Sequence, residues 1–160
     1  MRLAVLLEAS PPGLPPAPGP FKELRKLQLK LEKEAQWLRS KLATIERART
    51  TRNGNKEREE SATSAVFVRL KGPLLQLLEK MDLAAQNYLQ VLHTQQYSAV
   101  LRIREVLELP SIIGGMIGQI HHFNSPDLLL FAVSRDIFAG MDRASKAISV
   151  AAASYSSLEF

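Results

Sequence analysis

The stretch LRKLQLKLEKEAQWLRSKLATI, residues 24–45, decides the fold of this 160-residue chain. Apolar residues recur in it at spacings of three and four, at Leu24, Leu27, Leu31, Ala35, Leu38, Leu42 and Ile45. A repeat close to 3.5 residues is typical of an amphipathic helix that packs along other helices. The lysines of this region lie mostly off the apolar stripe, as a solvated helix face requires.

The composition favours packed helices. Hydrophobic residues make up 46% of the chain but aromatic residues only 6%, so the core must be aliphatic. Leu and Ala are good helix formers, and no useful run of alternating polar and apolar residues predicts a strand. There is no cysteine, which excludes disulfides and thiolate chemistry. We therefore expect an all-α protein, an elongated antiparallel helical bundle or coiled coil.

Proline and glycine divide the chain. Residues 10–20 hold six prolines, which suits an extended segment, so residues 1–20 are predicted to be a disordered Pro-rich arm. Residues 21–160 should form a single helical bundle domain. The expected helices cover about 21–52, 56–71, 74–109 and 126–156. The apolar, glycine-containing connection over 110–125 should be a buried connection or a short helix.

Three local patterns refine this division. Gly72-Pro73 predicts a kink or a brief break, and Pro110 predicts the end of the third helix. Gly114 and Gly118 in the connection suggest tight packing against a helix, and the small residues of the last helix, such as Gly140, should also allow close approach. Ser125, followed by Pro126, should cap that last helix.

No pattern indicates catalysis, a metal or a cofactor. Of the three histidines, His121 and His122 are adjacent and would point in different directions on a helix, and His93 is distant in sequence. A zinc site needs three or four convergent ligands. Neither a nucleophile elbow nor a phosphate-binding loop is present. We predict that the chain is not an enzyme, with no small-molecule substrate implied.

The excess positive charge is local. Residues 22–60 contain 12 Lys/Arg and 7 Asp/Glu, so their net charge of +5 equals that of the whole chain. The possible anion-binding residues are Arg47, Arg49, Arg52, Lys56 and Arg58, in a basic tip over residues 39–58. Such a cluster could bind nucleic acid or an anionic membrane, although interspersed glutamates dilute its field.

The apolar stripe leads to the favoured function, a non-catalytic interaction or assembly subunit that pairs with a helix of a second copy or of a different subunit. The residues expected to bind this partner are Leu24, Leu27, Leu31, Leu38, Leu42 and Ile45. The sequence leaves open that the stripe is instead the chain's own core. Anion binding by the basic tip is the alternative function. No apolar run reaches the roughly 20 residues of a membrane span, so an intracellular, soluble protein, cytoplasmic or nuclear, is expected.

Overall fold

The computed structural model describes residues 16–50, 56–95, 98–123 and 133–155, and within these ranges it contains helices and no strand. The all-α prediction is therefore confirmed. The elements are α2 (Gly19–Thr50), α3 (Lys56–Arg69), the π-helical turn η1 (Leu70–Leu74), α4 (Leu75–Gln95), α5 (Ser98–Leu101), α6 (Arg104–Leu107), α7 (Leu109–His122), the π-helical turn η2 (Val133–Ile137) and α9 (Phe138–Ala152).

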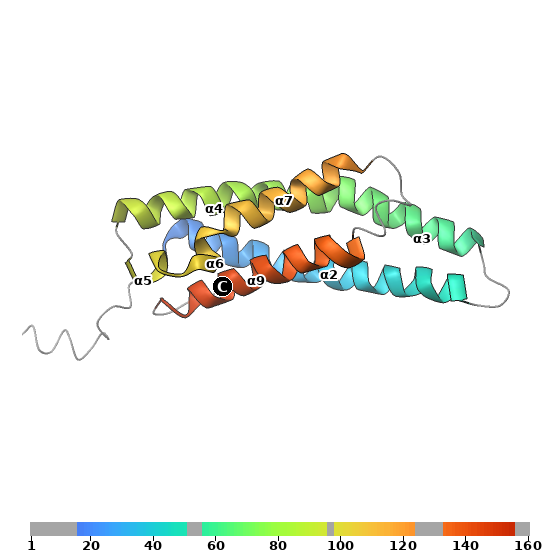
Figure 1. The fold of residues 1–160 in the computed structure, drawn as a ribbon, viewed down its shortest axis with the longest axis horizontal. Coiled ribbons are helices and arrows are strands. Elements are labelled where there is room, and N and C mark those ends of the chain that lie inside the picture. Colours follow the sequence, from blue (N-terminus) through green and yellow to red (C-terminus); the bar gives the residue numbers. More distant parts are fainter. Residues whose placement is uncertain (1–15, 51–55, 96–97, 124–132, 156–160) are drawn as a thin grey trace, which may run out of the picture.

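Four long helices surround one core. α2 packs against α4 and α9, and α7 packs against the same two helices from the other side (Figure 1). We call this part of the molecule the body. The C-terminal part of α2 and most of α3 pair with each other and extend past α7 and α9 (Figure 1). We call residues 43–50 of α2 and 56–65 of α3 the hairpin end.

The apolar stripe of α2 is buried inside the chain. Leu24, Leu27, Leu31 and Leu38 have at most 2% of their surface exposed, and they belong to the same hydrophobic cluster as the buried residues of α4, α7 and α9. Each of these helices buries one apolar face, and the four faces meet. The stripe is therefore the chain's own core, the alternative that the sequence left open.

Gly72-Pro73 lies inside a continuous helix. The amide of Leu75 donates to the carbonyl of Leu70, five residues back, so the chain passes Pro73 in a π-helical turn. Proline has no amide hydrogen and obstructs the normal α-helical turn, and the wider turn accommodates it. The helices predicted over 56–71 and from 74 onward are therefore joined without a break.

The prediction of a single helix over 74–109 is wrong. α4 ends at Gln95, and the short helices α5 and α6 lead to α7. Pro110 does not end a helix but stands in the first turn of α7, where a missing amide hydrogen leaves no bond unmade. The connection predicted over 110–125 is largely helical, because α7 buries Ile113, Met116 and Ile120 in the core. This burial outweighs the roughly 1 kcal/mol that each glycine costs a helix.

The glycines of α7 do not pack tightly. A Cβ atom added at Gly114, Gly115 or Gly118 would meet nothing within 4 Å, so the predicted close packing of this segment is wrong. At Gly140 of α9 there is no room for a side chain, because a Cβ atom there would lie 2.6 Å from Cγ of Met116. The missing side chain of Gly140 therefore makes space for the Met116 side chain of α7.

Parts of the predicted arm and of the last helix lie outside the described residues, namely 1–15, 124–132 and 156–160, and with them the expected cap at Ser125. The end of the predicted arm belongs to the bundle. Ala17 is buried, and the carbonyl of Pro18 accepts bonds from the amides of Phe21 and Lys22, both 3.1 Å long, at the start of α2.

Candidate functional site

The residues predicted to bind a partner face inward. Besides the four buried leucines, Ile45 is 3% exposed in the hairpin end, and Leu42 is partly buried against the core. In the folded chain these side chains contact its own helices. A partner would have to use another surface.

The predicted basic tip is only partly as expected. Arg47, Arg49, Lys56 and Arg58 are exposed at the hairpin end, whereas Arg52 lies outside the described residues. Nε of Arg49 donates to Oε1 of Glu59 over 2.6 Å, so this charge is balanced within the chain.

The excess charge lies along α2, and most of it lies outside the hairpin end, whose residues 43–50 and 56–65 hold four Lys/Arg and four Glu. α2 holds nine Lys/Arg and four Glu, a net charge of +5, whereas α3 holds three basic and three acidic residues. Much of this positive charge is therefore on the body.

The histidines do not converge. His93, His121 and His122 are exposed, and the described part of the chain has no group of three or more His, Asp or Glu side chains that could hold a metal ion. None of the described helices combines the length and the apolarity needed to cross a membrane.

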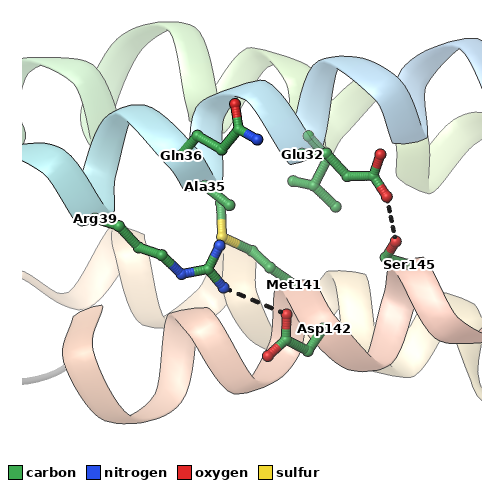
Figure 2. Close-up of a pocket in the computed structure, with 8 residues that line it drawn as sticks. Glu32, Ala35, Gln36, Arg39, Met141, Asp142 and Ser145 are labelled. Carbon is green, nitrogen blue, oxygen red and sulfur yellow. Dashed lines mark hydrogen bonds and ion pairs between the residues drawn. The ribbon is translucent and has the colours of Figure 1, made fainter.

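Among the grooves that the described residues form between neighbouring helices on the outside of the body, three differ in charge. The first runs between α2 and α9 (Figure 2). Here the hydroxyl of Ser145 donates to Glu32 over 3.0 Å, and Arg39 lies 3.6 Å from Asp142. Both signs of charge are present, and they meet across the groove.

Gln28, which is 2% exposed, fastens α9 to α2 beside this first groove. Its amide nitrogen donates to the carbonyl oxygen and the hydroxyl of Ser145 and to the hydroxyl of Ser149, at 3.0, 2.9 and 2.9 Å. Its carbonyl oxygen accepts a bond of 2.7 Å from Arg25. A polar group whose hydrogen bonds are all made within an apolar interface fixes the register of the two helices. The sequence did not single out Gln28, since the position of a glutamine beside the apolar stripe was the only signal it offered.

The second groove, between α7 and α9, also carries both signs. Its lining is Ser111, Ile112, Gly115, Met116, Gln119, Asp136, Ala139, Gly140 and Arg143. Arg143 lies 3.3 Å from Glu108, so its charge is balanced by a neighbouring element.

The third groove, between α2 and the helix formed by α3, η1 and α4, is basic, and we call it the lysine groove. Its volume is about 310 Å³, and its lining is Leu27, Lys30, Lys33, Glu34, Arg69, Pro73, Gln76, Leu77 and Lys80. Leu27 and Leu77 form an apolar floor, and Pro73 is exposed at its edge. The three lysines are exposed, and among the described residues none of them pairs with a carboxylate.

The single carboxylate of the lysine groove is already occupied. Arg69 binds Glu34 with both sides of its guanidinium group, with Nη2 at 2.7 Å from Oε1 and Nε at 2.9 Å from Oε2. The hydrogen bond that Arg69 donates to Glu34 raises the pKa of Arg69, because it stabilises the charged guanidinium. The guanidinium also lies 5.0 Å from the ring centre of Trp37, with Nζ of Lys41 at 5.7 Å from the same ring.

Comparison with known proteins adds nothing to this description, since no protein family, no curated protein and no solved structure matches the chain.

Proposed function

We propose that this chain is a non-catalytic interaction or assembly subunit that pairs with a helix of a partner along the lysine groove. A helix in this groove would lie beside both α2 and α4, in the coiled-coil-like side-by-side contact that long helices favour. The interaction thus uses the outside of α2, whereas its apolar stripe serves the core.

One observation carries this proposal, the charge imbalance of the lysine groove. The grooves that α9 forms with α2 and with α7 hold cations and anions together. In the lysine groove, Lys30, Lys33 and Lys80 surround an apolar floor without a carboxylate partner among the described residues. Like charges held close together repel, and a complementary partner relieves this repulsion.

A steric substitution tests whether the groove is used. Gln76 is exposed in the lysine groove, and Gln36 is similarly exposed in the groove between α2 and α9. Neither change to Trp alters the charge or the core. We expect Gln76→Trp to weaken association by about tenfold, equivalent to about 1.4 kcal/mol, and Gln36→Trp to leave it unchanged.

Association is measured by sedimentation velocity for self-pairing and by quantitative affinity purification for a different subunit, with both variants compared with the unchanged chain. The proposed function is contradicted if the chain stays monomeric and also retains no helical protein whose binding is weakened by Gln76→Trp. Equal effects of the two substitutions contradict the choice of groove.

Anion binding at the hairpin end has weaker support. Arg47, Lys56 and Arg58 are exposed there, but Glu57 and Glu60 are exposed beside them and reduce the local field. If this alternative is correct, Lys56→Glu with Arg58→Glu should abolish binding to RNA or to acidic vesicles. Absence of such binding by the unchanged chain at low salt excludes it.

A further inference from the structure

We propose that the occupant of the lysine groove is an acidic amphipathic helix of a partner protein. Its carboxylates would lie against Lys30, Lys33 and Lys80, and its apolar face against the exposed Pro73, above the buried Leu27 and Leu77. This inference rests on the proposed function, and it names the chemistry of the partner at the same site.

The positions of the lysines match a helical ligand. Lys26, Lys30 and Lys33 follow each other at spacings of four and three, so they lie on one flank of α2. Lys80 stands on the opposite wall, on α4. A helix between the walls would meet ammonium groups on both sides, and carboxylates on its own two flanks would complement them.

An exposed apolar residue follows the groove along α4. Leu83 follows Lys80 by three residues, so it lies on the same face of the helix, and it is 61% exposed. From Arg69 to Leu83 the helix rises by about 21 Å, which corresponds to roughly four turns. A partner helix of that length would place apolar residues at i, i+3 or i+4, and i+7 along the groove.

Two other anionic partners fit the groove less well. Sequence-independent binding of single-stranded nucleic acid uses open aromatic faces, but Arg69 and Lys41 already lie over the ring of Trp37. A membrane surface is engaged by an amphipathic face with apolar residues at its centre, whereas here the leucines form a floor between charged walls.

The test uses a labelled synthetic peptide of about 20 residues, helical and amphipathic, with leucines on one face and glutamates on both flanks. A second peptide has Gln in place of every Glu. A single-stranded RNA and vesicles that contain phosphatidylserine are the other two probes. Binding to the full chain is followed by fluorescence anisotropy, or by co-sedimentation for the vesicles, at low and at high salt.

The variants are matched in charge. The groove variant combines Lys30→Glu, Lys33→Glu and Lys80→Glu. The matched variant combines Lys22→Glu, Lys56→Glu and Lys146→Glu, which make the same change of charge at exposed positions outside the groove. We expect the groove variant to bind the acidic peptide at least about tenfold more weakly and the matched variant less than about twofold more weakly. The glutamine peptide should bind weakly to every form. Melting curves of both variants establish that they are folded.

Three results overturn the inference: no binding of the acidic peptide at low salt, equal losses in the two variants, or tighter binding of RNA or vesicles through the same three lysines. If Gln76→Trp disrupts association with a partner while the groove variant retains it, the acidic chemistry is wrong and the proposed function stands. If neither change affects any association, the proposed function fails as well.

Discussion

The body and the hairpin end are built on the same apolar stripe of α2, but they bury it differently. In the body, α4 and α9 cover the stripe from two sides, and Leu31 and Leu38 are at most 1% exposed. In the hairpin end, α3 is the described element that pairs with α2, and the buried residues there include the small Ala48 and Ala62. The periodicity of a helix therefore predicts which of its faces is buried, but elements distant in sequence decide how many helices pack against that face.

The largest expected effect follows from the cover in the body. Replacement of a buried Leu by Ala typically costs about 2–5 kcal/mol, and Glu adds the desolvation of a charge. Leu31→Glu with Leu38→Glu should therefore remove the folded state, since a domain of this size is stable by only about 5–15 kcal/mol. Circular dichroism should show a loss of helicity and no cooperative melting.

Exposed positions of the same helix provide the control. Leu29 is 51% exposed on α2, so Leu29→Glu should leave the melting temperature nearly unchanged. A double mutant at Leu31 and Leu38 that stays folded and monomeric would contradict the burial of the stripe. One that stays folded and loses a partner would restore the stripe as an interface.

The stripe also shows how far the sequence alone leads. The first helix, predicted over 21–52, is observed as Gly19–Thr50, because a long 3.5-residue repeat is a strong and local signal. The segment over 110–125 was predicted only as a buried connection or a short helix, because its glycines and Pro110 weaken the local helix signal. Its helicity comes from contacts of Ile113 and Met116 with the core, which the sequence does not show.

Only the α2 side of the lysine groove could be predicted from the sequence. The positions of Lys30 and Lys33 off the apolar stripe follow from the helical repeat, and they indicate a solvated face. Lys80 reaches the same groove only because α4 lies antiparallel beside α2, and Glu34 is occupied by Arg69 from 35 residues away. Pairing across helices is a property of the fold, so the sequence placed the basic site at the tip instead.

A second, smaller effect compares the two regions directly. Leu38→Ala in the body should cost about 3–5 kcal/mol, and Ile45→Ala in the hairpin end about 2–3 kcal/mol, because fewer helices surround Ile45 and its site can collapse more easily. Denaturant titrations measure both values. Amide hydrogen exchange should be faster around Ile45 than around Leu38 in the unchanged chain. Equal exchange in both regions would mean that the hairpin end opens only with the whole molecule.

The smallest expected effect distinguishes the two ion pairs that link α2 to α3. The side chain of Glu34 is 12% exposed and binds Arg69 with two oxygens, whereas that of Glu59 is 25% exposed and accepts one bond from Arg49. Glu34→Gln should cost about 1 kcal/mol and Glu59→Gln at most about 0.5 kcal/mol in denaturant titrations. High salt should remove the smaller effect and only part of the larger, since the more buried pair is less screened.

The raised pKa of Arg69 gives this ion-pair prediction a sign in pH. A group whose pKa rises on folding stabilises the fold below its unfolded pKa, and this contribution is lost only as the pH rises through the higher folded value. Both values lie above the usual working range, so the effect of Glu34→Gln should be constant between about pH 7 and pH 9. A loss of this effect within that range would show that Glu34 is not held by a charged Arg69. The Glu34–Arg69 pair would then not be part of the wall of the lysine groove.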